Sequence, residues 1–83
     1  MIDESLHFGL RDFFFVESNE TDLTYDYVGF MDRNGVILIG QYTKDGNNAL
    51  YYAVTGDFAT VFAARDSYTY VTPNLLADPR VAS

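Results

Sequence analysis

The sequence predicts an α+β fold, with one N-terminal helix packed on a four- to five-stranded antiparallel meander sheet. Near the N-terminus, apolar residues recur at helical spacing. From residue 23 onward the apolar pattern changes to a period of two, and short turn sequences rich in Gly, Asn and Asp separate the later segments. At 83 residues the chain is expected to form one small domain, 1–83.

The helix is expected from about residue 3 to 15, within an N-terminal helical segment of about residues 1–17. An acidic start suits the positive end of a helix dipole. The apolar residues that follow fall on one helical face, namely Leu6, Leu10, Phe13 and Phe14. Gly9 and the aromatic run at 13–16 oppose the helix and are more typical of a strand, so a strand remains the alternative for this segment.

Residues 18–22 contain no apolar side chain and predict an acidic loop, after which residues 23–72 predict the sheet. Alternation at 23–27 indicates the first strand, and Gly29 is a candidate position for a bulge. The sequence Asp32-Arg33-Asn34-Gly35 is the clearest hairpin turn. Residues 36–43 predict the next strand, whose four consecutive aliphatic residues indicate burial on both faces and therefore a central position.

A second hairpin connection is expected at 44–48, followed by a strand at 49–55 with Tyr51 and Tyr52 on opposite faces. Residues 58–64 predict either a fourth strand or a short helix, and the Thr-Val-Phe sequence within them favours the strand. Residues 68–72 predict a fifth strand. The remaining residues, 73–83, are expected to form an extended tail or a single helical turn after the proline that begins them.

The composition suggests a cytoplasmic protein, or one of the host cytoplasm if the chain is viral. The chain has no cysteine, which fits a reducing compartment. Its N-terminal residues carry the wrong charge for a secretion signal, and its longest apolar runs are four residues, so no membrane span is expected. The net charge of −7 also argues against direct binding to nucleic acid or to an anionic membrane.

The whole net charge lies in the first 32 residues, where eight acids stand against one base. From residue 33 onward, four acids balance four bases. A surface of one sign attracts oppositely charged partners. We therefore expect a small acidic protein-interaction module that binds a basic protein surface, as an inhibitor or a nucleic-acid mimic of the viral type in its most specific form. The expected binding edge consists of Glu17, Glu20, Asp22, Asp26 and Asp32.

The alternative is a structural or assembly protein that self-associates into a homo-oligomer through sheet edges and exposed tyrosines. All seven tyrosines fall in predicted strands, and one helix cannot cover them all. Tyrosine is enriched at protein interfaces because it combines a large stiff ring with a polar tip. The expected aromatic binding face consists of Tyr25, Tyr27, Tyr51 and Tyr52.

Catalytic, cofactor and metal sites are not expected, and the chain is predicted not to be an enzyme. The six glycines do not form a phosphate-binding loop, and His7 is the only histidine. The turn at 32–35 resembles the start of a calcium loop, but the sixth and twelfth positions are Ile37 and Thr43 rather than Gly and Glu. Asp26 and Asp32 are an acid pair by count only, because no spacing places them in a cleft.

Overall fold

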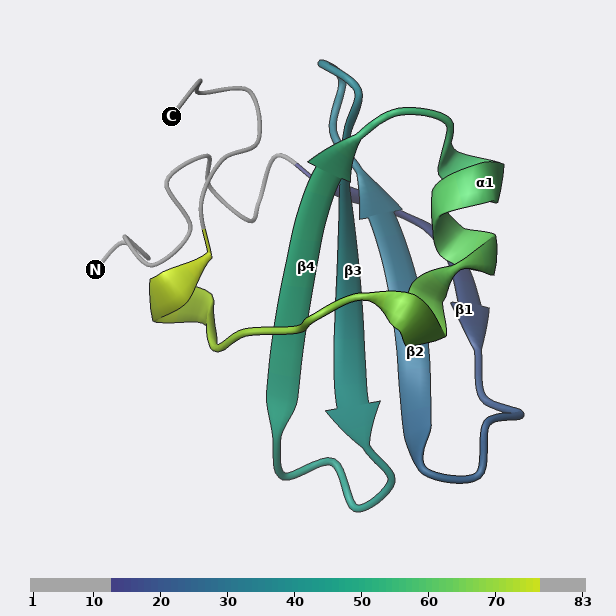
Figure 1. The fold of residues 1–83 in the computed structure, drawn as a ribbon, viewed down its shortest axis with the longest axis vertical. Helices are drawn as coiled ribbons and strands as arrows, with labels where there is room; N and C mark the ends of the chain where they lie inside the picture. The colour runs from purple at the N-terminus through teal and green to yellow at the C-terminus, as the bar shows by residue number, and fades with distance from the viewer. Residues whose placement is uncertain (1–12, 77–83) are drawn as a thin grey trace.

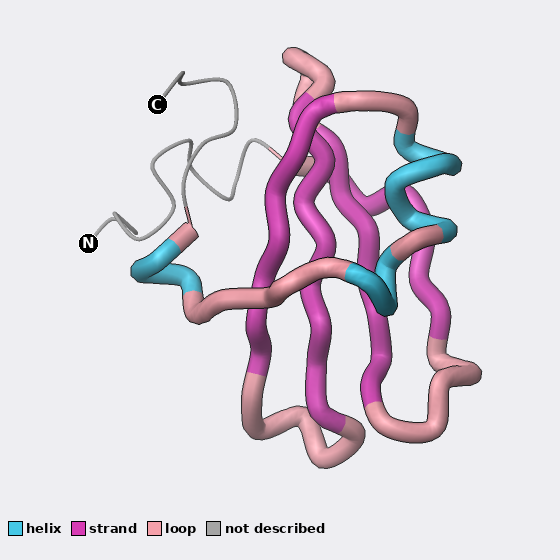
Figure 2. Tube along the Cα trace, in the orientation of Figure 1, coloured by secondary structure: helices cyan, strands magenta, loops and turns pink. Residues whose placement is uncertain are grey.

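The computed structural model of the protein describes residues 13–76. Four strands form one antiparallel sheet in which neighbours in sequence are neighbours in space (Figure 1). A six-residue helix, α1, and two 3₁₀ turns, η2 and η3, follow the strands (Figure 2). In chain order the elements are β1 (Phe14–Asn19), β2 (Tyr25–Met31), β3 (Val36–Thr43), β4 (Ala49–Thr55), α1 (Phe58–Ala63), η2 (Arg65–Ser67) and η3 (Pro73–Leu75).

The α+β class and the antiparallel meander are confirmed, but the predicted position of the helix is wrong. The helix of the described chain follows the sheet instead of preceding it. Residues 14–17, assigned to the N-terminal helix, belong to β1, because their aromatic and β-branched side chains suit a strand paired with β2. Residues 1–12, which carry the rest of that prediction and also His7, lie outside the described residues.

The predicted strand boundaries are correct for β3 and β4, whereas the start predicted for β2 and the bounds predicted for the acidic loop shift. β1 includes Ser18 and Asn19, so the acidic loop spans residues 20–24 rather than 18–22. β2 begins at Tyr25, and Leu23, which was expected to start the strand, is 95% exposed in the loop. A bulge does interrupt the pairing beside Gly29, but the extra residue lies in β1, between Phe15 and Glu17.

β3 is the central strand, as the run of aliphatic residues predicts. The side chains of Val36, Ile37, Leu38 and Ile39 are all fully buried. Because successive side chains of a strand point to opposite faces, this burial requires a covering layer on each side of the sheet. One layer centres on Phe62, which packs with Ile37 and Ile39, and the other on Leu76, which packs with Leu38.

Both predicted hairpin turns are present. Gly35, in the turn between β2 and β3, has φ +87°, and Gly46, between β3 and β4, has φ +78°. These are backbone conformations that glycine adopts without the steric penalty of a Cβ atom. The amide of Gly35 donates to the carbonyl of Asp32 (3.2 Å), and that of Gly46 donates to the carbonyl of Thr43 (2.9 Å). The turns therefore set the register of the central hairpins.

Residues 58–63 form α1 rather than the favoured fourth strand, so that preference is wrong and the helical alternative is correct. The side chain of Asp57 caps the helix, because its Oδ2 accepts hydrogen bonds from the backbone amide (3.0 Å) and the hydroxyl (2.9 Å) of Thr60. The preceding Gly56 has φ +144°, which allows the sharp exit from β4. Local capping thus outweighs the strand preference of the Thr-Val-Phe sequence.

α1 packs closely on the sheet because Gly29 has no side chain. A Cβ atom at this position would lie 2.5 Å from Cζ of Phe58 and 3.0 Å from Cδ1 of Phe62. The two phenyl rings are stacked, with centroids 5.4 Å apart. The missing side chain of Gly29 therefore leaves the space into which the rings fit.

The segment after α1 crosses the sheet and passes around the outer edge of β4 (Figure 1). Tyr68 and Tyr70 pack on the α1 side of the sheet, and Val71 then exchanges two backbone hydrogen bonds with Tyr51 (2.7 and 3.0 Å). Beyond this bridge Leu76 packs on the opposite side. The predicted fifth strand is therefore wrong: only Val71 makes a strand-like pairing, and η3 supplies the helical turn expected after it.

We predict that Gly29→Ala will destabilise the fold by about 1–3 kcal/mol, because the added methyl group overlaps the Phe58 ring. Chemical denaturation measures the change in the free energy of unfolding. In the double variant with Phe58→Ala, part of this cost should disappear, since the smaller side chain leaves room for the methyl group. Strict additivity of the two single losses would contradict the proposed overlap.

Candidate functional site

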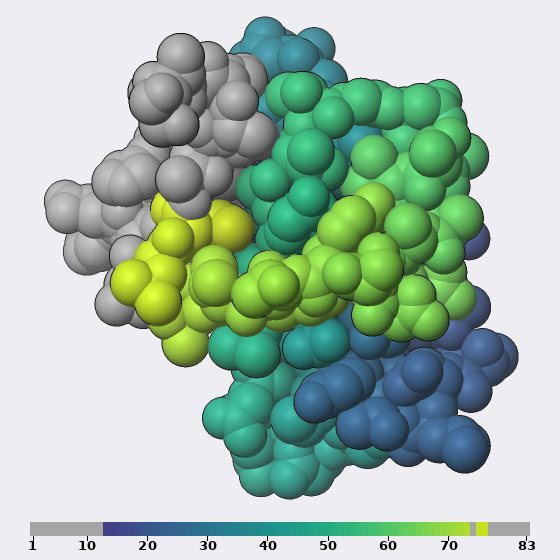
Figure 3. All heavy atoms as spheres, viewed as in Figure 1, coloured from purple at the N-terminus to yellow at the C-terminus, as the bar shows by residue number. Residues whose placement is uncertain are grey.

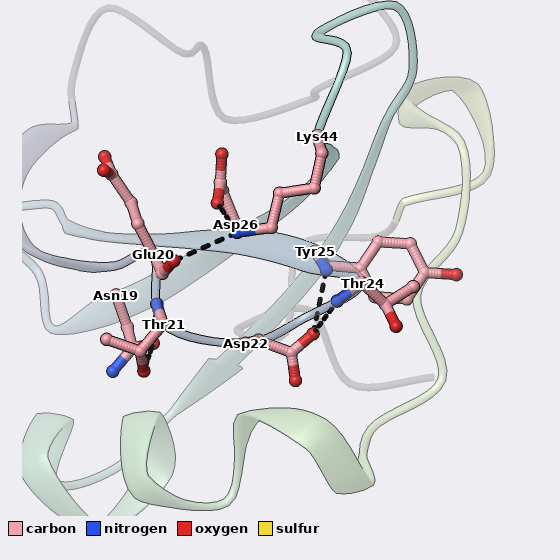
Figure 4. Close-up of polar contacts among 8 residues, drawn as sticks. All are labelled: Asn19, Glu20, Thr21, Asp22, Thr24, Tyr25, Asp26 and Lys44. Atoms are coloured by element: carbon pink, nitrogen blue, oxygen red, sulfur yellow. Dashed lines mark hydrogen bonds and ion pairs between the residues drawn. The ribbon is translucent and has the colours of Figure 1, made fainter.

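The acidic loop between β1 and β2 has a defined conformation, which its own side chains maintain (Figure 4). Oδ1 of Asn19 accepts hydrogen bonds from the amide and the hydroxyl of Thr21, at 3.1 and 2.9 Å. Oδ2 of Asp22 accepts from the amides of Thr24 and Tyr25, both at 2.8 Å. Short polar side chains that bond to nearby backbone amides in this way are typical of turns. The loop therefore enters β2 as an ordered turn.

Lys44, at the start of the β3–β4 hairpin, anchors the loop to the sheet (Figure 4). Its Nζ atom donates to Oδ1 of Asp26 (2.6 Å) and to the backbone carbonyl of Glu20 (3.0 Å). The Lys44 and Asp26 side chains are 40% and 31% exposed, so solvent screens part of this attraction. The ammonium neutralises Asp26, whereas the Glu20 carboxylate is directed away from it.

The carboxylate of Asp22 remains charged although it accepts hydrogen bonds that hold the loop. The hydrogen bonds that it accepts from the backbone amides of Tyr25 and Thr24 lower its pKa below the usual 3.8. Donation from an amide stabilises the ionised form and leaves its charge in place. Asp22 thus combines a structural role with a negative charge at the surface.

Asp32 lies apart from the other predicted acids. It follows β2 at the end opposite to the acidic loop, and the seven residues of that strand correspond to a separation of about 20 Å. Its side chain is only 4% exposed, and its Oδ1 accepts from the amides of Asn34 (2.9 Å) and Val36 (2.8 Å). Asp32 therefore organises the β2–β3 turn, away from the loop that carries Glu20 and Asp22. Glu17 lies opposite Gly29, between the two ends of β2.

Beside these acids, β1 presents an apolar surface that the sequence analysis missed. Phe14 is 54% exposed, Phe15 60% and Val16 36%, and Glu17 follows them directly and is also exposed. We call residues Phe14–Glu17 the β1 edge. The run of aromatic and β-branched residues could have suggested a strand, but its exposure depends on β1 being the outermost strand of the sheet.

The four predicted tyrosines do not form one exposed face. Tyr27 is only 3% exposed, and its hydroxyl accepts a hydrogen bond from Nε2 of Gln41 (3.2 Å). Tyr25, Tyr51 and Tyr52 are half-buried. As the alternation predicts, Tyr51 lies on the opposite side of the sheet from Tyr52.

Most of the aromatic surface is used in packing the C-terminal segment. The rings of Tyr52 and Tyr68 stack with centroids 4.1 Å apart, and Tyr70 lies 5.9 Å from Tyr27. The hydroxyl of Tyr70 donates to the carbonyl of Arg65 (2.6 Å), and burial raises its pKa. The Arg65 guanidinium lies 5.8 Å from the centre of the Tyr27 ring, and the two side chains form a cation–π contact.

Within residues 13–76, no group of three or more His, Cys, Asp or Glu side chains is arranged to hold a metal ion. In the same part of the chain, no helix has the length and apolar character needed to cross a membrane.

Comparisons with protein-family models, curated proteins and solved structures find no match to this chain. The candidate site consists of the β1 edge and the acidic loop, because both are exposed. In Figure 3 the acidic loop protrudes below the band formed by the C-terminal segment.

We predict that Asp22→Asn will destabilise the protein at pH 7 and that this difference will shrink in acid. Because the folded pKa of Asp22 lies below its unfolded value of 3.8, its ionised form contributes stability above that value, which is lost as the pH falls through the folded pKa. Thermal unfolding of both proteins between pH 7 and pH 2 measures the effect. A difference that does not change with pH would show that the charge of Asp22 contributes nothing.

Proposed function

We propose that the protein is a small, acidic, non-catalytic protein-interaction module that binds a basic protein surface. One observation carries the proposal: Glu17, in β1, and Glu20 and Asp22, in the loop that follows it, form no ion pair among residues 13–76. Lys44–Asp26 is the only ion pair among residues 13–76. The neighbouring carboxylates are therefore available to a positively charged partner.

The ordered loop also supports this proposal. A loop already held by hydrogen bonds loses less conformational entropy when it binds than a mobile one does. Leu23, which is 95% exposed in the loop, adds an apolar side chain directly after Asp22. A nucleic-acid mimic of the viral type is a narrower form of the same proposal, in which these carboxylates would stand in for successive phosphates.

We predict that Glu20→Lys will weaken binding to a partner captured from the source organism by about tenfold, since removing an attraction and adding a repulsion each cost up to about 1 kcal/mol at an exposed site. Asp66→Lys is the matched control, because it changes the net charge equally at an exposed position outside the acidic segment. Titration calorimetry at low and high salt measures both effects. Equal losses in the two variants, or an affinity independent of salt, would refute the proposal.

Self-association through a sheet edge is the second candidate function, and the exposure of Phe14, Phe15 and Val16 on an outermost strand favours it. An uncovered apolar strand edge is a template for pairing with another chain. If this is the function, sedimentation equilibrium at micromolar concentration will show a dimer or larger oligomer, and Phe15→Ser will convert it to a monomer. A monomer across the whole concentration range would eliminate this candidate.

A further inference from the structure

We propose that the β1 edge accepts an extended basic strand of a partner protein, which adds to the sheet antiparallel to β1. The inference rests on the proposed function, because it describes how the β1 edge and the acidic loop bind a basic protein. Within residues 13–76, β1 pairs with β2 on one side and with no strand on the other. Backbone amides and carbonyls on an outer strand edge bind most readily to another extended segment.

The two edges of the sheet differ in whether another part of the described chain covers them. At the β4 edge, Val71 exchanges both backbone hydrogen bonds with Tyr51, and the C-terminal segment passes around the strand. The β1 edge has no such cover among the described residues, and it exposes large apolar side chains instead. Among residues 13–76, one edge of the sheet is therefore covered and the other is accessible.

The bulge determines which side chains share a face of the β1 edge. Phe14 lies opposite Met31 and Glu17 lies opposite Gly29, so both belong to the α1 side of the sheet although three positions separate them. Phe15 lies opposite Phe30, on the other side. An apolar and an acidic side chain therefore stand next to each other on the same face.

This arrangement specifies the partner's sequence. On β2, three consecutive residues lie opposite Glu17, Phe15 and Phe14, in that order along the chain. An antiparallel strand on the outer side with the same spacing would place its residues in the same order. Charge complementarity then calls for Lys or Arg opposite Glu17, and burial of the phenyl rings calls for two apolar residues directly after it.

A second copy of β1 is a poorer occupant. If all six residues of two antiparallel copies paired, Phe14 would face Asn19, Phe15 would face Ser18, and Val16 would face Glu17. Every apolar residue would then meet a polar one. Each copy would also contribute a net charge of −7, so the two copies would repel each other. A basic strand avoids both conflicts.

The test uses the full chain, labelled for NMR, and a synthetic capped peptide, Thr-Thr-Lys-Ile-Val-Thr. One control peptide carries Glu in place of Lys. The other keeps every side chain but is N-methylated at alternate residues, which removes the amide donors that strand pairing needs. Amide shifts and hydrogen exchange of the protein report where each peptide binds.

The lysine peptide is expected to protect amides within residues 14–19 from exchange, and the N-methylated peptide is expected to abolish this protection. The glutamate peptide should bind about two- to fivefold more weakly, as loss of one exposed ion pair allows. Glu17→Gln should remove the preference for lysine over glutamate, whereas the control Asp66→Asn should retain it. Because both are exposed positions, neither substitution is expected to impair folding.

Three results would overturn the inference. If the peptide perturbs only residues 20–24 and N-methylation has no effect, strand addition is wrong while the proposed basic partner stands. If the β1 amides that do not bond to β2 are already protected without peptide, a second copy or residues 1–12 occupy the edge, and sedimentation distinguishes these two cases. If no protection appears even at millimolar peptide, the edge does not bind basic strands. Failure of the salt and charge-reversal tests would in addition reject the proposed function.

Discussion

The burial of β3 on both faces is the constraint on which the rest of the structure depends, because a single sheet can bury its central strand only beneath two separate covering layers. The residues after β4 contribute to both layers, and Phe13, before β1, also packs on the Leu38 side. Phe62 covers the side of Ile37 and Ile39, and Leu76 covers the side of Leu38. To reach both sides, the segment must pass around one edge of the sheet, and it passes around β4.

This route explains why the two edges and the charges differ. Covering the β4 edge leaves β1 at the far side without a described neighbour, so the exposed apolar residues concentrate there. The acids divide in a similar way. Asp32 and Asp57 stabilise a turn and a helix start, and Asp26 pairs with Lys44. Glu17, Glu20 and Asp22 belong to β1 and the loop that follows it and form no ion pair among the described residues, so a binding surface there can combine charge with apolar contact.

The sequence predicts those elements whose cause is local. Four consecutive aliphatic residues indicate the buried strand β3, and Gly35 and Gly46 mark turns that need a positive φ. Phe14 and Phe15 could not be assigned correctly, because only pairing with β2 makes them a strand and only their place in the sheet order exposes them. The structural roles of Asp26 and Asp32 were equally hidden, since their charge alone indicates a surface.

The order of the elements along the chain has a consequence for the way the protein forms. All four strands are synthesised before α1 and before the tyrosine-rich segment that covers the sheet. The three hairpins are local, so they can pair early, whereas Leu76 must return to Leu38, thirty-eight positions back in the chain. Until the C-terminal layers are in place, the aliphatic side chains of β3 are not covered by Phe62 and Leu76. Docking of those layers must therefore follow synthesis of the whole sheet, and until it occurs the exposed aliphatic faces favour aggregation.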